Sequence, residues 1–240
     1  MTAVILAAGT ASRMRPLTDT TPKSLLPIGG KPLLQRTLEV LHSRGIKRCV
    51  IVTGHCHEMI KAFVQLMGLP LHVSYVYNPH FATTNNNYSL WLARADVIGR
   101  SMLLLDADIL FHTQILARLL DSPHTNALVV RLSNNLGHEE IKLEIDRSDR
   151  VTKIGKEINP LEAAGESLGI EKFSAAAVRP LFEALGERKD RDEFYEASFQ
   201  EIIDRGVKIY SVDSGSYPCI EIDTIEDLRA ADKLARAALQ

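Results

Sequence analysis

Short apolar runs that alternate with helical patterns constrain the fold of this chain more than any other feature. "AVILAA" (residues 3–8) and "RCVIVTG" (residues 48–54) lack a regular polar alternation, which is typical of strands buried on both faces of a sheet. Between them, residues 32–43 carry leucines at helical spacing, and Gly45 follows as a helix-ending residue. A buried strand, a helix and a second buried strand predict a parallel pair joined by a right-handed crossover.

The same alternation continues through the first half of the chain. The elements expected next are a helix over residues 57–68, strands over 71–78 and 101–110, a helix over 114–120 and a strand over 127–132. We therefore predict an α/β fold with a Rossmann-like sheet that is mixed but mostly parallel and has helices on both faces.

The second half has a different pattern. Residues 140–146 and 150–158 alternate apolar and polar side chains around the turn "DRSD", which predicts a half-exposed hairpin. Asp227 stands three residues after Thr224, as in a capping box. No linker or repeat interrupts the 240 residues, so we expect one domain whose elaborated second half covers one end of the sheet. The remaining expected elements are helices over residues 175–185 and 193–205, strands over 208–212 and 219–223, and a helix from Thr224 to the C-terminus.

Composition narrows the class of protein. With 45% hydrophobic residues the chain can bury an ordinary core, and its net charge of −2 provides no basic stripe for nucleic acid or an anionic membrane. No apolar run approaches the roughly 20 residues of a membrane span, and no basic residue precedes the N-terminal apolar run, as it would in a signal peptide. Cys49, Cys56 and Cys219 are odd in number and form no CxxC motif. We expect a reduced, cytoplasmic protein that binds neither nucleic acid nor membranes.

The segment after the first expected strand carries small and basic residues suited to an anion. It is "LAAGTASRMRPLTDTTPKSLLPI" (residues 6–28) and matches neither GxGxxG nor the P-loop. Gly9 and its small neighbours allow backbone N–H groups to approach a phosphate closely, and Arg13 and Lys23 can neutralise it. Each residue alone has a plainer explanation, because a glycine after a strand often makes only a turn and exposed basic residues are usually solvated.

Two pairs of carboxylates stand at the ends of later strands. Asp106 and Asp108 lie in "LLLDADIL", and Glu221 and Asp223 lie in "CIEIDT". Their i, i+2 spacing turns both members of a pair to one side of the sheet, where they can hold a hard divalent cation with phosphate oxygens. The plainer alternatives are a loop-capping aspartate beside a solvated one and, for Asp223, a helix cap in competition with Thr224.

The combination LAAG-x-x-SR followed by PKSLLPI resembles the nucleotidyltransferases that join an NTP to a small phosphorylated acceptor. The resemblance spans nearly the whole chain and implies the nucleotide-diphospho-sugar transferase type of fold. It implies a nucleotide-binding part over about residues 1–130 and an acceptor-binding part, with the C-terminal helix, over about residues 131–240. Many members have a second glycine where this chain has Ala11.

The resemblance also implies roles for individual residues. Those expected to line the nucleotide are Leu6, Ala7, Ala8 and Gly9. Those expected to hold the triphosphate and stabilise the transition state are Arg13 and Lys23. Those expected to bind Mg²⁺ are Asp108 and Asp223, with Asp106 as an auxiliary ligand beside the nucleotide.

The acceptor needs contacts of its own. Lys156 in "KIGKEI" matches the family's lysine that contacts the acceptor's phosphate, although most lysines are simply solvated. "GESLGIEKFS" (residues 165–174) resembles the family's acceptor-lining strand and makes Glu166 a candidate contact to the far end of the acceptor. Glu221 is assigned to the same acceptor set.

The stretch "NPHFATTNNNYSLWLA" (residues 78–93) indicates a branch of the family. It resembles the phosphocholine cytidylyltransferases and their relatives that act on 2-aminoethylphosphonate or inositol phosphate. The amides of Asn85 and Asn86 offer donors and acceptors for the edge of cytosine or for a polar acceptor. With Thr84, they form the nucleotide contacts predicted here.

Aromatic residues bear on the identity of the acceptor. Tyr88 and Trp91 are three residues apart on one helical face, which suits cation–π attraction to an ammonium group, and core packing explains Trp91 equally well. A cage for trimethylammonium needs three or four rings, and the chain is only 6% aromatic. The further contributors considered are Phe173, Tyr195 and Tyr217.

Together these patterns predict a Mg²⁺-dependent cytidylyltransferase that transfers CMP from CTP to a small phosphorylated or phosphonate acceptor. Phosphocholine is favoured, with 2-aminoethylphosphonate close behind, and the protein is expected to be a monomer or homodimer. The alternatives are a sugar-1-phosphate or inositol-phosphate nucleotidyltransferase, a glycosyltransferase and a non-catalytic nucleotide-binding module. A glycosyltransferase has no need of Arg13 and Lys23, and a module that has lost its chemistry usually loses one of the charged residues.

A further cluster, His55, Cys56 and His57, invites a metal-site interpretation. Adjacent residues on an extended chain point apart, so they are unsuited to holding one ion together. We take them as loop residues, with His55 a candidate neighbour of the ribose.

Overall fold

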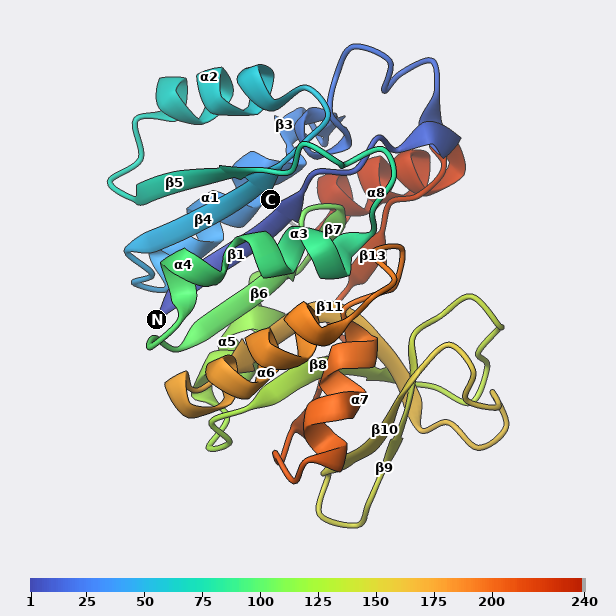
Figure 1. Ribbon diagram of the computed structural model, residues 1–240. Helices are drawn as coiled ribbons and strands as arrows, with labels where there is room; N and C mark the ends of the chain where they lie inside the picture. The colour runs from blue at the N-terminus through green and yellow to red at the C-terminus, as the bar shows by residue number, and fades with distance from the viewer. Residues whose placement is uncertain (239–240) are drawn as a thin grey trace.

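The structure, a computed structural model, describes residues 1–238 (Figure 1). The strands are β1 (Thr2–Ala7), β2 (Pro27–Ile28), β3 (Lys31–Pro32), β4 (Arg48–Thr53), β5 (His72–Tyr77), β6 (Met102–Asp106), β7 (Ile109–Phe111), β8 (Ala127–Leu132), β9 (Lys142–Ile145), β10 (Val151–Gly155), β11 (Gly165–Phe173), β12 (Tyr210–Asp213) and β13 (Cys219–Glu221). The α-helices are α1 (Leu33–Ser43), α2 (His57–Met67), α3 (Asn86–Leu92), α4 (Arg94–Val97), α5 (Thr113–Asp121), α6 (Ala175–Glu187), α7 (Glu196–Asp204) and α8 (Ile225–Ala238).

One large sheet organises the described part of the chain. Its main path runs β10-β9-β11-β6-β1-β4-β5, and β8 pairs with both β11 and β12. The pairs β6–β1, β1–β4 and β4–β5 are parallel, as the apolar strand runs of the first half predict. The antiparallel pairs gather around β11, the long strand that joins β6 to β8 and β9. The mixed α/β sheet with an elaborated second half is therefore confirmed.

Helices cover both faces of this sheet. Leu34, Leu38 and Leu41 of α1 pack with Ile115 and Leu116 of α5 in a core on one face. The core on the other face joins α3 and α4 to α6 and α7, as Figure 1 shows in the foreground. A smaller core lies between α8, β2 and the strand β13.

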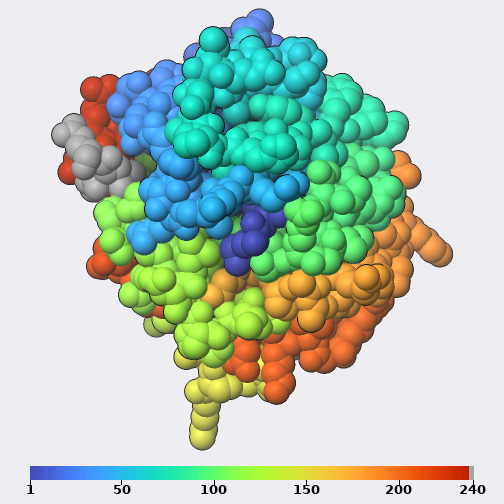
Figure 2. Space-filling model, turned by 90° about the vertical axis from the view of Figure 1, so that its left-hand side faces the viewer, coloured from blue at the N-terminus to red at the C-terminus, as the bar shows by residue number. Residues whose placement is uncertain are grey.

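The second half extends the sheet beyond this layered part. The antiparallel pair β9–β10 forms the predicted hairpin. Its turn projects from the molecule as the yellow tip at the bottom of Figure 2. The helix α7 packs on β10, so the elaborated half lies against one end of the sheet.

The last helix begins as its sequence signal predicts. The Thr224 hydroxyl accepts the Asp227 N–H at 3.2 Å, and Asp227 Oδ2 accepts the Thr224 N–H at 2.8 Å, which is a reciprocal cap. The helix α8 then runs from Ile225 to Ala238, and residues 239 and 240, to which its prediction extended, lie outside the described residues. Within residues 1–238, no helix combines the length and the apolar character that a membrane crossing requires.

Candidate active site

The pairing of β1 with β6 brings the glycine loop beside the first carboxylate pair. Leu6 lies opposite Asp106 in this parallel register. Both strands end at the same edge of the sheet, and the Ala107 N–H donates to the Leu6 carbonyl at 3.2 Å. The loop from Gly9 to Lys23 and the segment around Asp108 therefore leave the sheet together, as expected for a ligand site at the carboxyl ends of strands.

A second, smaller pairing brings in the other carboxylates. The strand predicted over residues 101–110 is broken after Asp106, and its continuation, β7, pairs with β13 instead. Glu221 lies opposite Ile109, and the Ile222 N–H donates to the Asp108 carbonyl at 3.0 Å. The two carboxylate pairs therefore meet although more than a hundred residues separate them in the sequence.

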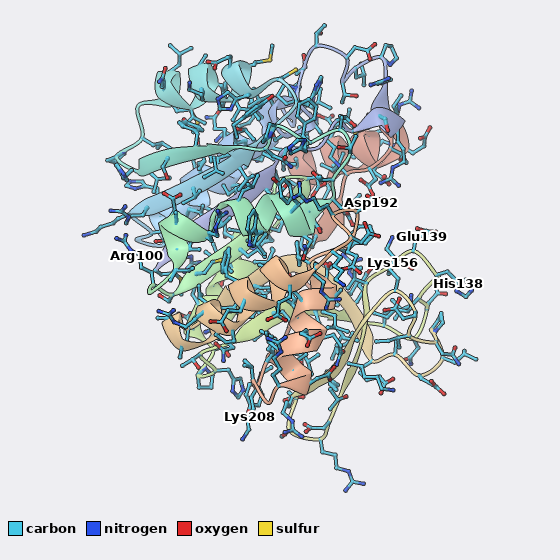
Figure 3. All side chains as sticks on the ribbon, in the orientation of Figure 1. Arg100, His138, Glu139, Lys156, Asp192 and Lys208 are labelled. Atoms are coloured by element: carbon cyan, nitrogen blue, oxygen red, sulfur yellow. The ribbon has the colours of Figure 1, made fainter. Side chains whose placement is uncertain are left out.

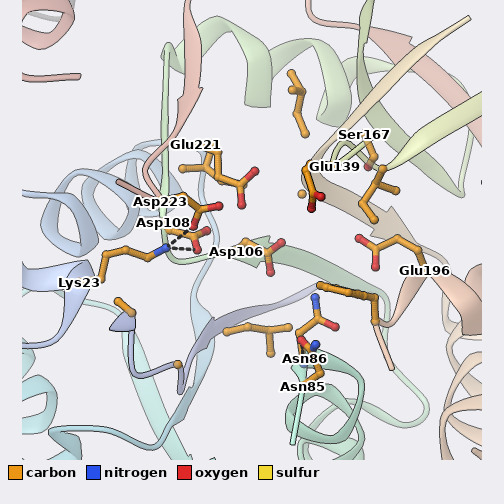
Figure 4. Close-up of a pocket in the computed structure, with 18 of the residues that line it drawn as sticks. Lys23, Asn85, Asn86, Asp106, Asp108, Glu139, Ser167, Glu196, Glu221 and Asp223 are labelled. Atoms are coloured by element: carbon orange, nitrogen blue, oxygen red, sulfur yellow. Dashed lines mark hydrogen bonds and ion pairs between the residues drawn. The ribbon is translucent and has the colours of Figure 1, made fainter. Parts of the chain in front are cut away.

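Three carboxylates form a cluster that suits a divalent cation. Oxygen atoms of Asp108, Glu221 and Asp223 all lie within 4.8 Å of one another (Figure 4). Asp108 Oδ1 is buried and has no hydrogen-bond partner among the described residues. Hard oxygen donors with one unsatisfied lone-pair site fit Mg²⁺ or a similar ion. The sequence assigned Glu221 to the acceptor, whereas its position here is beside the predicted metal ligands.

Basic side chains from the loop after β1 reach this cluster. Lys23 Nζ lies 2.8 Å from Asp108 and 3.0 Å from Asp223, and Arg13 lies 2.6 Å from Asp223. Burial lowers the pKa of Lys23, but the two carboxylates outweigh it, and the pKa is raised above its usual value. The four charged residues that the sequence predicted as catalytic or metal-binding thus form one ion-pair network.

Ala11 stands where many members of the family that this sequence resembles have a second glycine. It adopts φ 49° and ψ 47°, the left-handed conformation that glycine tolerates and a side chain does not favour. A second glycine at this position in many members fits the same backbone. The Thr18 hydroxyl donates to the Ala11 carbonyl at 2.8 Å and helps to hold the loop in this shape.

A cavity of about 570 Å³ opens over these groups. Leu6, Ala8 and Gly9 line it, whereas Ala7 packs in the core on one face of the sheet and lines a smaller cavity with Lys23 and Asp108. The other predicted residues along its wall are Arg13, Lys23, Thr84, Asn85, Asn86, Asp106, Asp108, Lys156, Glu166, Glu221 and Asp223. Residues that the sequence did not single out, and that also line it, are Phe81, Arg131, Glu139, Glu140, Phe194 and Glu196.

The three consecutive asparagines tie the two halves of the molecule together. Asn85 caps α3, and its backbone N–H donates to the Arg191 carbonyl at 2.8 Å. Asn86 Oδ1 accepts the Tyr195 N–H at 2.9 Å, and Asn87 Oδ1 accepts the Ser198 hydroxyl at 3.0 Å. Asn85 and Asn86 still line the cavity, so their predicted contacts to a nucleotide stay predictions. Their visible partners are the segment before α7, which is why the helix predicted from residue 193 begins only at 196.

The tyrosines predicted for the acceptor lie elsewhere. Tyr88 stacks on Trp91 with ring centroids 5.7 Å apart, and Arg191 and Arg94 of this chain cover the two rings. Tyr217 stacks on His112 instead, at 4.9 Å. Together with Tyr195, which is fully buried, these tyrosines lie outside the cavity lining of the described residues. A cage built from them is not supported, because their rings already pack on groups of this chain.

Tyr195 contacts a carboxylate of the cavity from within the protein core. Its hydroxyl donates to Asp106 Oδ2 at 2.8 Å. Gly169, at φ +63°, lies beside this carboxylate, and a Cβ there would come within 2.7 Å of Asp106 Oδ2. The bulge in β11 around this glycine therefore makes room for Asp106.

The acceptor-side residues are paired in different ways. Glu166 forms an ion pair with Arg131, the residue opposite it on β8, at 2.8 Å. Burial raises the pKa of Glu166, and Arg131 partly offsets this. Lys156 Nζ lies 3.5 Å from the exposed Glu139, and Figure 3 shows the two side by side at the rim. The charged residue within the apolar strand "ALVVRL" was the one available sequence signal for Arg131.

Several carboxyl groups in and behind this wall have raised pKa values. Burial is the main cause that raises the pKa of Asp106 and of Glu171 well above the usual range. The negative charge of Glu196 raises both pKa values further, and that of Asp106 adds to the shift of Glu171. Burial also raises the pKa of Glu196 to about 7 and that of Glu221 to about 7. Carboxyl groups along this part of the cavity therefore keep their protons to a higher pH than free side chains do.

The His55–Cys56–His57 segment does not form a metal site in the described chain. His55 pairs through its ring with the Thr18 carbonyl at 2.8 Å. Cys56 is the cap of α2, and His57 is the first residue of that helix. All three residues lie outside the cavity lining of residues 1–238.

The fold and this edge of the sheet define the nucleotide-diphospho-sugar transferase class of α/β proteins. The sequence profile of the MobA-like NTP transferase domain matches residues 3–200, and the chain belongs to that family. A solved structure of the CTP:phosphocholine cytidylyltransferase LicC from Streptococcus pneumoniae shares the fold with a TM-score of 0.77 at 22% identity, over 97% of this chain and 98% of that one.

Curated relatives place the chain among cytidylyltransferase-like sequences. It is 30% identical to the CMP-5'-(3-aminopropyl)phosphonate synthase of Streptomyces rubellomurinus over 96% of its own length and 38% of that protein's. It is 25% identical to the 2-aminoethylphosphonate cytidylyltransferase of Lancefieldella rimae over 96% of its own length and 91% of that protein's. The chain spans only 38%, 44% and 53% of the first three curated relatives it matches.

Proposed function

We propose that this protein is a Mg²⁺-dependent cytidylyltransferase that transfers CMP from CTP to a small phosphorylated or phosphonate acceptor and releases pyrophosphate. The observation that carries the proposal is the meeting of two basic residues and three carboxylates beside a glycine loop, at one edge of the sheet. Lys23 contacts both Asp108 and Asp223, and Arg13 contacts Asp223. Such a network suits a metal-bound triphosphate better than a neutral ligand.

The reaction needs little covalent work from the protein. A phosphate or phosphonate oxygen of the acceptor attacks the α-phosphorus of CTP, and the bond to the β-phosphate oxygen breaks as pyrophosphate leaves. Arg13 and Lys23 would shift from their carboxylate partners to the triphosphate and neutralise the charge that develops on it. Asp108 and Asp223, with Glu221 beside them, would hold Mg²⁺, which supplies further charge neutralisation at the phosphates.

Lys156 is the proposed clamp for the acceptor. It lines the same cavity as Lys23, and its ammonium lies 4.5 Å from the centre of the Phe194 ring. Its present partner, Glu139, has a side chain that is 96% exposed, so the pair is weak and an acceptor phosphate can replace it. Names of relatives that act on phosphocholine and on 2-aminoethylphosphonate support an acceptor of this size.

A pyrophosphate-release screen tests the proposal. Purified protein with Mg²⁺ is combined with each of four NTPs and with phosphocholine, 2-aminoethylphosphonate, phosphoethanolamine, inositol 1-phosphate and glucose 1-phosphate. We expect release with CTP and a small acceptor. Release only with UTP or dTTP and glucose 1-phosphate would assign a sugar-nucleotide enzyme instead, and no release from any combination would favour a non-catalytic module.

A further inference from the structure

One buried carboxylate of the cavity, Glu196, forms no ion pair with any basic residue among residues 1–238. Glu196 is the first residue of α7 and is 5% exposed. Its Oε2 is buried without a hydrogen-bond partner, and no basic residue of the described chain forms an ion pair with it. In Figure 4 its carboxylate points into the cavity. A carboxylate in such a place is unfavourable unless a cation or a proton joins it.

Several other carboxylates of the cavity have a basic partner. Asp108 and Asp223 have Lys23, and Glu166 has Arg131. The lining of the described chain holds eight carboxylates but only four basic side chains, so the excess of negative charge is large before any phosphate enters. Figure 4 shows Glu196, Glu139, Asp106 and Glu221 around one open space, and Glu196 closes it on the side away from Lys23.

We propose that Glu196 binds the primary ammonium group of the acceptor, so that the acceptor is a short aminoalkyl phosphate or phosphonate. The inference rests on the proposed function, because it places the acceptor's anionic end at Lys156. Lys156 and Glu196 line the same cavity, and the Lys156 ammonium lies 4.5 Å from the centre of the ring of Phe194, two residues before Glu196, so a short chain can span the two groups. The ammonium end of the acceptor would then meet the carboxylate of Glu196, and its phosphate or phosphonate end would meet the ammonium of Lys156.

The chemistry of the wall selects a primary over a quaternary ammonium. A primary ammonium donates N–H bonds to carboxylate oxygens, which gives charge-assisted hydrogen bonds. A trimethylammonium group has no N–H and is best held by several aromatic faces. In the described chain the aromatic residues along the cavity are Phe81 and Phe194, and Lys156 already lies over the Phe194 ring. The cavity lining therefore favours an acceptor with a primary ammonium group over phosphocholine, the acceptor that the sequence favoured.

Three matched ligands test this inference. They are 2-aminoethylphosphonate, its N,N,N-trimethyl analogue and propylphosphonate, in which a methyl group replaces the ammonium. Calorimetry measures their binding to the whole protein with Mg²⁺, with and without an α,β-methylene analogue of CTP whose bond cannot be broken. The variants are Glu196→Gln, which keeps the shape and removes the charge, and Glu201→Gln, a control on the exposed side of the same helix.

We expect the wild type to bind the primary amine at least about tenfold more tightly than either analogue. Glu196→Gln should reduce this preference to within about threefold, whereas Glu201→Gln should keep it. Equal binding of amine and propylphosphonate by the wild type, or tightest binding of the trimethyl analogue, would overturn the inference even if Glu196→Gln failed to fold.

Failure of the inference and failure of the proposed function give different results. Pyrophosphate release from CTP with no preference for the amine leaves the cytidylyltransferase proposal intact and removes the ammonium site. A preference for the amine in calorimetry without pyrophosphate release keeps the ammonium site and removes the proposed reaction.

Discussion

The two ends of the cavity hold similar carboxylates in opposite circumstances. At the end beside the glycine loop, Asp108 and Asp223 are bridged by Lys23, and Arg13 adds a further ion pair. At the far end, Glu196 is 5% exposed, and no basic residue of the described chain forms an ion pair with it. The first end already contains the cations that a triphosphate needs, whereas Glu196 at the second end forms no ion pair among the described residues.

This difference teaches how one cavity can take two ligands of different charge. The basic residues near β1 can move from carboxylates to phosphates, so that end accepts an anion together with a metal ion. At the far end, a ligand that carries its own positive charge can offset the buried negative charge of Glu196. Four experiments sharpen or break this contrast.

The largest effect is expected at the first end. Asp108→Asn removes a charge from the predicted metal cluster, and turnover in the pyrophosphate assay should fall by at least about 10³-fold. Asp96→Asn, a change on α4 outside the cavity lining, should leave turnover within about twofold. Substantial turnover by Asp108→Asn would remove Asp108 from the site.

The pH dependence of stability tests the far end. The pKa of Glu196 is raised from 4.5 to about 7 by burial, with Glu221, Asp106 and Glu171 facing it and Lys156 opposing the shift. Between these values the folded state holds a proton that the unfolded state has lost. The free energy of unfolding should therefore fall as the pH rises through about 7, by up to about 3 kcal/mol.

Glu196→Gln has no such proton to lose. Urea unfolding at pH 5, 6, 7 and 8 should show a smaller fall for this variant than for the wild type, since Glu221 titrates in both. Parallel curves for the two proteins would show that Glu196 is not a buried, partnerless carboxyl.

Lys156 lies between the two ends. Lys156→Ala should raise the KM for the acceptor by about tenfold and leave the KM for CTP nearly unchanged, because it removes only an acceptor contact. Lys153→Ala is the matched control, since Lys153 lies on β10, three residues before Lys156, and pairs with Glu144 outside the cavity. An unchanged acceptor KM in Lys156→Ala would contradict its assignment.

The smallest effect is expected where the halves are tied together. Asn87 is 3% exposed, and Asn87→Ala leaves the buried Ser198 hydroxyl without its partner. The free energy of unfolding should fall by about 1 kcal/mol. Asn135→Ala, in the exposed loop after β8, should change it by less than about 0.5 kcal/mol. A double-mutant cycle between Asn87→Ala and Ser198→Ala would show no coupling if the contact were absent.

Much of the first half could be predicted because its signals are local. Continuous apolar runs marked β1, β4 and β6, and the pair Thr224 and Asp227 marked the start of α8. The motif around Gly9 led to Arg13 and Lys23 before any geometry was known. Each of these inferences rests on residues that lie close together in the sequence.

The far end could not be predicted in the same way. Glu196 looks like any surface glutamate within a helical pattern, and its burial follows from the tertiary packing of α7, which contacts β10 and α6. Glu221 reaches the cluster through the pairing of β13 with β7, a contact between distant segments. Tyr195 was expected beside a ligand because it is aromatic, but tertiary packing turns its hydroxyl to Asp106.

A competition experiment tests the contrast between the two ends most directly. Equal concentrations of 2-aminoethylphosphonate, its trimethyl analogue and propylphosphonate are mixed with CTP, Mg²⁺ and protein, and the CMP adducts are counted by mass spectrometry. We predict that the amine adduct exceeds each other adduct by at least about tenfold for the wild type, and by less than about threefold for Glu196→Gln. An equal mixture of adducts from the wild type, or an excess of the propylphosphonate adduct, would contradict an ammonium site at the far end.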